Sequence, residues 1–233
     1  MLPFTPIFIP GLLCTELLFV KQRDMLPDAG LMADTMSHDT IHDMARAALG
    51  LCDGPLVPVG LSMGGYVALE MARLAPQRMA GMALLSTNCQ NDSEASKAQR
   101  QHAIALAQHK GFQGVTRHLM PRLLSPAAIK DDALVADVLA MAADIGRVGF
   151  VQQQTAIMGR RAQHDTLTSF TAPLLVLCGT LDILTPPALS VEMAGLAAEA
   201  ELCLLDGVGH LSSMEAPEAV SNALEALFER AVV

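Results

Sequence analysis

Short apolar runs alternate with segments of helical periodicity along most of the chain. The apolar runs contain few polar residues, which is typical of strands buried on both faces of a parallel sheet. We predict six such strands, at residues 6–9, 31–33, 56–59, 82–85, 174–178 and 201–205. Apolar residues recur at helical spacing in the segments 15–26, 40–49, 63–74, 187–198 and 216–231. This alternation predicts an α/β fold with a mostly parallel sheet and helices on both faces.

One long segment interrupts the alternation. Residues 91–168 are helical in composition and contain no convincing strand. Connections between a helix and a strand usually span only a few residues, so this segment is too long to be an ordinary loop. We therefore predict a single domain, 1–233, in which residues 91–168 form a helical cap inserted over one edge of the sheet.

Composition and charge exclude several classes of protein. Hydrophobic residues make up 52% of the 233 residues and charged residues only 17%, which excludes a disordered chain. The net charge of −9 argues against a nucleic-acid partner, because phosphate contacts need clustered lysine and arginine. No stretch approaches ~20 consecutive apolar residues, so we predict no membrane span.

The start of the chain and its cysteines indicate a cellular location. The first residues are apolar but brief, contain prolines and lack a basic region, which favours a first strand over a secretory signal. The cysteines are odd in number and form no CxxC pair, so we predict neither a disulfide framework nor a zinc site. They are Cys14, Cys52, Cys89, Cys178 and Cys203. We expect reduced thiols in a cytoplasmic protein.

The strongest chemical signal is the run Gly60-Leu61-Ser62-Met63-Gly64, between an apolar run and a helical segment. A strand, a sharp turn and a helix are what a GxSxG nucleophile elbow requires, with the serine hydroxyl exposed by a strained backbone. The glycines leave room where the turn crosses itself. We predict that Ser62 is a nucleophile; the alternative is a glycine-rich turn whose buried serine caps the helix.

A serine hydroxyl needs a base, and the base needs an orienting carboxylate. Among seven histidines, His210 stands out because it follows the last predicted strand in a glycine-rich loop. Asp182 follows the fifth predicted strand and gives the chain order Ser, Asp, His. Asp206 is the rival carboxylate, but it lies only four residues before His210 and suits a turn or capping role better.

The negatively charged oxygen of an acyl-transfer intermediate needs hydrogen-bond donors. We predict that these are the main-chain N–H groups of Met63, next to the nucleophile, and Leu12, in the loop after the first strand. Leu13 is the alternative to Leu12. Cys14 lies in the same loop, but no base is paired with it, so we expect a small buried residue.

With these motifs the whole chain resembles a compact α/β-hydrolase. The motifs are GLSMGG at 60–65, GTLDILTP at 179–186 and GVGHLSSMEAPEAV at 207–220. The nearest resemblance is to small bacterial esterases, enol-lactonases and C–C bond hydrolases with a helical cap. It implies that Ser62, Asp182 and His210 form a catalytic triad and that the cap shapes the acyl pocket.

Two features depart from that family. Pro10-Gly11 stands where a His-Gly pair is usual after the first conserved strand, which affects the expected shape of the oxyanion loop. The chain also begins at that strand, so we expect about six strands rather than eight.

The pocket is the least determined part. Candidate wall residues are Leu13, Phe112, Met120, Phe150, Ile157 and Met158. Helical spacing alone requires that a helix bury one face, so each residue of the insertion is also a candidate for plain core. Arg160 and Arg161 are candidates to bind a substrate carboxylate, although a solvated helix end is the favoured interpretation.

We therefore predict a serine hydrolase that cleaves carboxylic esters or lactones of small molecules and needs no metal or organic cofactor. An enclosed aliphatic pocket should favour short acyl chains over palmitate. Two alternatives remain open, a C–C bond hydrolase or lyase with the same triad, and a non-catalytic small-molecule binder on this fold. We expect no membrane partner, and the oligomeric state stays open.

Overall fold

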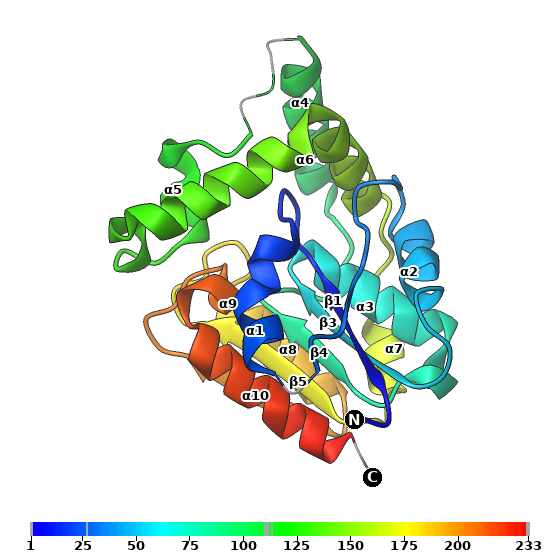
Figure 1. The fold of residues 1–233 in the computed structure, drawn as a ribbon. Helices are drawn as coiled ribbons and strands as arrows, with labels where there is room; N and C mark the ends of the chain where they lie inside the picture. Colours follow the sequence, from blue (N-terminus) through cyan, green and yellow to red (C-terminus); the bar gives the residue numbers. More distant parts are fainter. Residues whose placement is uncertain (1, 27, 110–111, 113, 232–233) are drawn as a thin grey trace.

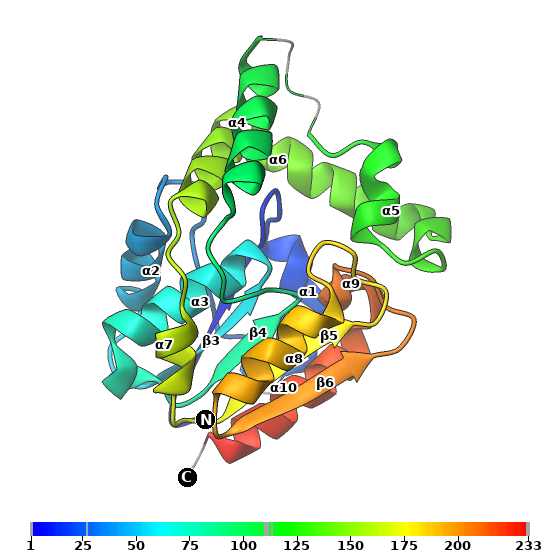
Figure 2. The ribbon, with the colours of Figure 1, turned by 180° about the vertical axis from the view of Figure 1, so that it is seen from behind.

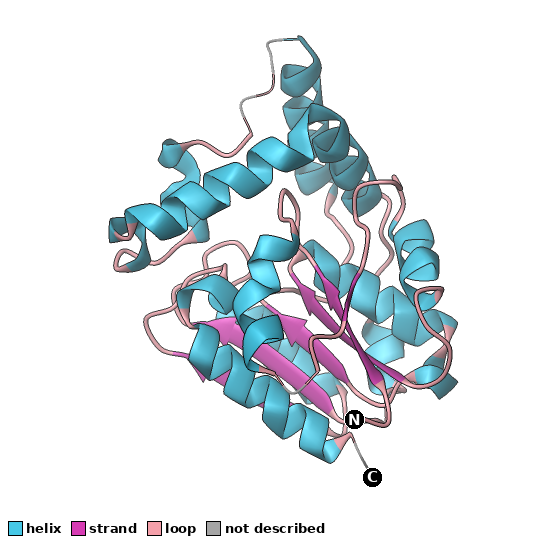
Figure 3. Cartoon of the chain, in the orientation of Figure 1, coloured by secondary structure: helices cyan, strands magenta, loops and turns pink. Residues whose placement is uncertain are grey.

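The computed structural model describes residues 2–26, 28–109, 112 and 114–231, and these form one six-stranded sheet with helices on both faces (Figures 1 and 3). The strands are β1 (Thr5–Ile9), β2 (Leu31–Met32), β3 (Leu56–Leu61), β4 (Met82–Leu85), β5 (Leu174–Gly179) and β6 (Ala200–Leu205). All neighbouring strands are parallel, in the order β2-β1-β3-β4-β5-β6. The predicted fold class is therefore confirmed.

The central strands are apolar throughout because both of their faces are covered. Every residue of β3, β4 and β5 is buried. Side chains alternate between the faces along a strand. In β5, Leu174 and Val176 belong to one hydrophobic core, whereas Leu175 and Leu177 belong to the other.

Two layers of helices enclose the sheet (Figures 1 and 2). One core is shared with α2 (Ile41–Leu49), α3 (Met63–Leu74), α7 (His164–Thr168) and α8 (Pro187–Leu196). The opposite core is shared with Leu18 and Phe19, which directly precede α1 (Val20–Met25), and with α9 (Ser212–Glu215) and α10 (Pro217–Arg230).

Capping residues explain where two N-terminal helices begin. The segment predicted as one helix at 15–26 is a 3₁₀ turn, Glu16–Phe19, followed by α1. The Thr15 hydroxyl accepts a hydrogen bond from the Leu17 amide at the start of that turn. The Thr40 hydroxyl accepts one from the Asp43 amide at 3.0 Å and caps α2.

Three helices of the inserted region lie beyond the edge of the sheet where the strands end (Figure 1). They are α4 (Glu94–His109), α5 (Met120–Leu123) and α6 (Asp132–Met158), and no strand occurs in the described part of the insertion. Gly146 interrupts α6 with a φ of 64° and a ψ of −173°. By contrast, α7 packs on the body, where Leu167 is fully buried. We retain the insertion, apart from α7, as a proposed cap.

The two ends of the insertion meet at one place. The Gln163 amide donates to the Cys89 carbonyl oxygen at 2.7 Å. Arg160 donates from Nε to the Gln90 carbonyl oxygen at 2.9 Å and from Nη1 to Asp92 Oδ1 at 2.5 Å. The chain therefore leaves and re-enters the body through two segments that are bonded to each other.

No described helix is both long enough and apolar enough to cross a membrane.

Candidate active site

Ser62 stands alone between the end of β3 and the start of α3. Its backbone angles, a φ of 57° and a ψ of −114°, lie outside the regions that residues other than glycine normally adopt. The turn is tight because its glycines approach other backbone closely. A Cβ on Gly64 would collide with the Ile9 carbonyl, and one on Gly60 would collide with the Gly64 backbone. This strand, turn and helix match the geometry of a nucleophile elbow.

Three loops bring Ser62, His210 and Asp182 together. His210 Nε2 lies 3.0 Å from Ser62 Oγ, and His210 Nδ1 lies 2.8 Å from Asp182 Oδ2. The histidine and the aspartate are both buried, with exposed fractions of 4% and 3%. This arrangement allows the imidazole to take a proton from the hydroxyl while the carboxylate fixes its tautomer.

The Asp182 carboxylate is held by several donors. The amides of Leu184 and Thr185 donate to Oδ1, each at 2.9 Å. The Thr185 hydroxyl donates to Oδ2 at 2.7 Å. Burial raises the pKa of the Asp182 carboxyl, but the His210 ring and the Thr185 donors outweigh burial and hold that pKa below its usual range. The carboxylate is therefore ionised and faces the imidazole.

The rival carboxylate has a different role. Asp206 is exposed, and its Oδ1 accepts a hydrogen bond from the Thr180 hydroxyl at 3.2 Å. The same hydroxyl accepts one from the Gly207 amide at 2.9 Å. Asp206 therefore takes part in the turn after β6, whereas Asp182 is the carboxylate that contacts His210.

The loop that follows β1, which is the proposed oxyanion loop, runs beside Ser62. A Cβ on Gly11 would lie 3.4 Å from Ser62 Cβ. In the part of the chain that the structure describes, the main-chain amides of Leu12 and Met63 have no acceptor. The Leu13 amide is occupied, because it donates to Gln153 Oε1 at 2.9 Å. The geometry thus favours Leu12 over Leu13 as the second donor.

Gln153 of α6 was not predicted from the sequence. Its side chain is fully buried, and its Nε2 donates to the Thr35 carbonyl oxygen at 3.2 Å. The residue lies between Gln152 and Gln154, so nothing in the sequence distinguishes the buried glutamine from its two neighbours.

Cys14 is a buried thiol, as predicted. It donates to the Leu12 carbonyl oxygen at 3.4 Å. Burial raises the pKa of the Cys14 thiol to about 12. A protonated thiol is a poor nucleophile, so Ser62 is the better candidate in this part of the site.

A cavity of about 860 Å³ opens above Ser62 and His210, between the body and the cap. Leu12 and Leu13 of the oxyanion loop contribute to its wall. The cap contributes an aromatic pair, Phe112 and Phe150, whose ring centroids lie 5.2 Å apart, together with aliphatic residues that include Ile157. Its size is that of a small-molecule site.

Two predicted wall residues do not line this cavity, which corrects the sequence-based assignment. Met120 is only 1% exposed and packs into the core on the α10 side of the sheet. Met158 follows Ile157 in α6, and successive residues of a helix point about 100° apart. Ile157 therefore faces the cavity while Met158 does not.

Arg160 is not a solvated helix end. Its side chain is 6% exposed, forms an ion pair with Asp92, and lies over the Tyr66 ring at 4.2 Å from the centroid. It lines a smaller cavity of about 340 Å³, and so does Arg161, which is exposed. Neither arginine lines the cavity above Ser62.

One group of side chains has the residue types of a metal site. Ligand atoms of Cys89, His164 and Glu192 lie within 4.8 Å of one another, away from the cavity above Ser62. Burial, together with the Glu192 charge, raises the pKa of the Cys89 thiol to about 11. His164 Nε2 and Glu192 Oε1 are already 3.0 Å apart, so a hydrogen bond accounts for this pair without an ion.

One protein family matches most of the chain. The model of the family described as "Serine aminopeptidase, S33" matches residues 28–217, a range that includes Ser62, Asp182 and His210. The chain belongs to this family. Its fold and its family therefore both place it in the α/β-hydrolase superfamily, as the sequence motifs predicted.

Individual relatives carry several names. A protein of Mycobacterium tuberculosis named as a non-heme bromoperoxidase is 28% identical over 205 residues, which cover 85% of this chain and 76% of that protein. A thermophilic esterase from Thermogutta terrifontis, solved with malate bound, superimposes with a TM-score of 0.91 at 25% identity and covers 99% of this chain and 91% of its own. An enol-lactonase from Burkholderia xenovorans LB400 shares the fold, with a TM-score of 0.81 at 19% identity over 97% of this chain and 92% of its own. The chain is thus similar to enzymes of the α/β-hydrolase type.

Proposed function

We propose that this protein hydrolyses carboxylic esters or lactones of small molecules through an acyl-enzyme on Ser62. The observation that carries the proposal is the hydrogen-bonded series from Ser62 Oγ through His210 to Asp182, with steps of 3.0 and 2.8 Å. The series begins at the floor of a cavity large enough for a small molecule.

In the proposed first half-reaction, Ser62 Oγ attacks the carbonyl carbon of the ester while His210 Nε2 takes the hydroxyl proton. Asp182 accepts a hydrogen bond from His210 Nδ1–H and stabilises the positive imidazolium. The tetrahedral oxyanion accepts hydrogen bonds from the Leu12 and Met63 amides. Collapse of the intermediate breaks the ester C–O bond, and His210 gives its proton to the leaving alcohol.

In the second half-reaction, water replaces the alcohol. His210 takes a proton from the water, and the resulting hydroxide adds to the acyl carbon. The bond from that carbon to Ser62 Oγ then breaks, His210 returns the proton to Oγ, and the carboxylic acid is released. These steps use the side chains of Ser62, His210 and Asp182, the main-chain amides of Leu12 and Met63, and water.

The family and the fold support hydrolysis as the reaction class. The likeness to an esterase at 25% identity supports an ester as the scissile group. The apolar residues around the cavity support an acyl or alcohol portion that is itself apolar near the ester bond. The free thiols of all five cysteines are consistent with the cytoplasmic location that we propose.

The test is covalent labelling together with turnover. We expect a fluorophosphonate to add to the wild-type protein once, at Ser62, and to leave Ser62→Ala unlabelled. We expect short p-nitrophenyl esters, acetate to hexanoate, to be hydrolysed faster than palmitate. Labelling at Cys14 would contradict the assignment of the nucleophile.

The same experiment separates the alternatives. A C–C bond hydrolase would be labelled at Ser62 but would leave simple esters, lactones and thioesters almost untouched. A non-catalytic binder would be neither labelled nor active. Either result would overturn the proposed ester or lactone hydrolysis.

A further inference from the structure

The cavity above Ser62 is positively charged although the protein is acidic overall. Among the described residues that line it, Arg100 of α4 and Arg122 of α5 are charged at neutral pH, and there is no aspartate or glutamate. The chain as a whole has a net charge of −9. The charge of the cavity wall is therefore opposite in sign to that of the protein.

The charge on Arg100 is not fully compensated. Arg100 Nε donates to Asp92 Oδ2 at 2.7 Å, but the other oxygen of Asp92 is taken by Arg160. One carboxylate thus serves two guanidinium groups, which leaves one positive charge in excess. Asp92 and Arg160 are nearly buried, with 4% and 6% of their side chains exposed, and Arg100 is 24% exposed. Charges withdrawn from water are costly without a partner of opposite sign.

Arg100 also has a donor to spare. Its Nη1 donates to Gln154 Oε1 at 2.7 Å, and Gln154 lines the same cavity. The remaining nitrogen, Nη2, makes no hydrogen bond within the described part of the chain.

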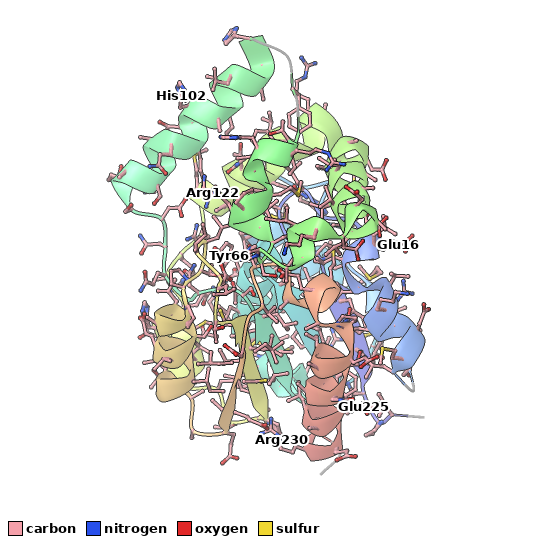
Figure 4. All side chains as sticks on the ribbon, turned by 90° about the vertical axis from the view of Figure 1, so that its left-hand side faces the viewer. Glu16, Tyr66, His102, Arg122, Glu225 and Arg230 are labelled. Atoms are coloured by element: carbon pink, nitrogen blue, oxygen red, sulfur yellow. The ribbon has the colours of Figure 1, made fainter. Side chains whose placement is uncertain are left out.

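Arg122 supplies the second charge. It is exposed, and the described residues offer its guanidinium neither a hydrogen bond nor an ion pair. Figure 4 shows Arg122 and Tyr66 at the level where the cap meets the body. Both residues line the cavity. The two arginines therefore belong to the cap side of the cavity, whereas Ser62 and His210 belong to the body side.

We propose that Arg100 and Arg122 bind a second, ionised carboxylate on the substrate, so that this enzyme acts on a carboxylate-bearing ester or lactone. A monoester of a dicarboxylic acid is the simplest member of that class. A guanidinium group donates two parallel hydrogen bonds to a carboxylate, and such charge-assisted bonds are stronger than neutral ones. Aliphatic and aromatic residues between the two ends would contact the carbon chain. This inference rests on the proposed ester or lactone hydrolysis.

The experiment compares two esters that differ only in the terminal charge. Monomethyl adipate and methyl hexanoate have acyl chains of equal length, and release of methanol measures both reactions. We expect wild-type kcat/KM to be about tenfold or more higher for monomethyl adipate. We expect Arg122→Gln to reduce this ratio about tenfold, whereas Arg117→Gln should keep it. Arg117 is an exposed cap arginine near Asp132 that does not line the cavity.

A binding measurement separates the two proposals. In Ser62→Ala, adipate should raise Tm more than hexanoate does, and Arg122→Gln should remove the difference. If neither ester reacts but adipate still binds through Arg122, the proposed reaction fails and the anion site stands. If wild type prefers methyl hexanoate, or if adipate binds no better than hexanoate, the anion site is wrong. Arg100 forms an ion pair with Asp92, so its replacement would also loosen the cap. The Arg122→Gln variant is therefore the one that tests the anion site.

Discussion

The side-chain carbonyl oxygen of Gln153 accepts a hydrogen bond from the main-chain N–H of Leu13 at 2.9 Å. This hydrogen bond joins the cap helix α6 to the oxyanion loop, and the Gln153 side chain is fully buried. Leu13 has a φ of 59°, which is unfavourable for a residue with a side chain. We infer that the bond helps to hold the loop in a shape that turns the Leu12 amide toward the Ser62 elbow.

Replacing Gln153 by leucine should therefore impair the chemical step more than substrate binding. Because Gln153 positions the donor rather than serving as one, we expect kcat to fall about tenfold, less than the loss typical of a missing oxyanion donor, with a smaller change in KM. Steady-state kinetics with a short ester measures both. Gln152→Leu, one residue away on α6, is the control and should keep the wild-type kcat. An equal loss in both variants would show that the helix, not the hydrogen bond, matters.

Asp182→Asn should keep the fold and lose turnover. An amide cannot hold the imidazole in the required tautomer, so kcat should fall on the order of 10⁴-fold. Asp206→Asn removes only the charge in a surface turn, because the amide oxygen can still accept the hydrogen bond from Thr180, and this variant should retain nearly full activity. Activity assays on both variants, with circular dichroism to verify folding, make the comparison. A dead Asp206→Asn beside an active Asp182→Asn would reverse the assignment.

Glu70 should make the protein sensitive to acid. This residue of α3 is 4% exposed and accepts hydrogen bonds from Arg73 and Gln163 and contacts His42. Burial raises the pKa of the Glu70 carboxyl, but these partners outweigh it and lower that pKa from 4.5 to about 2. A pKa that is lower in the folded state means that the ionised carboxylate stabilises the protein above about pH 4.5 and that this contribution is lost toward pH 2.

We expect that contribution to be on the order of 3 kcal/mol, since one pKa unit corresponds to about 1.4 kcal/mol. Urea unfolding of wild type and Glu70→Gln, repeated from pH 7 to pH 2.5, measures it. The stability gap between the two proteins should narrow as the pH falls below 4.5. A gap that is independent of pH would mean that Glu70 acts through packing alone.

Gly64→Ala should destabilise the protein severely, because the new Cβ would collide with the Ile9 carbonyl in a turn that cannot widen. We expect a loss of about 3 kcal/mol or more. Gly195→Ala is the matched control. A Cβ at Gly195, near the end of α8, meets nothing within 4 Å, so alanine should stabilise the helix by about 0.5–1 kcal/mol. Thermal unfolding of both variants tests the contrast.

The features predictable from sequence are those encoded locally. The strand β3, the elbow at Ser62 and the helix α3 are consecutive, so one pattern of apolar and glycine residues indicates all three. The residues that follow β5 and β6 are placed by the parallel sheet, whose strands all end at one edge. This is why Asp182 and His210 could be paired with Ser62 before any distance was known.

The cap was less predictable because no sheet orients its helices. Whether Met120 faces the cavity or the core depends on how α5 is rotated, and its apolar character fits both. For the same reason, the sequence did not indicate that Arg100 and Arg122 line the cavity. The basic pair Arg160-Arg161 is conspicuous in the sequence. Arg100 lies in a polar stretch and Arg122 is a single charge among apolar residues, and a surface role is the ordinary interpretation of both.

The hydrogen bond between the two ends of the insertion bears on how the insertion could be replaced during evolution. Because the carbonyl of Cys89 and the amide of Gln163 are already joined, a short turn between the two ends could close the body without moving the sheet. The proposed catalytic side chains, Ser62, Asp182 and His210, all belong to the body, whereas Arg100 and Arg122 belong to the proposed cap. If the proposed roles hold, selectivity and chemistry lie on separate segments of one chain, so exchanging the insertion for another is a route to new substrates that leaves the reaction unchanged.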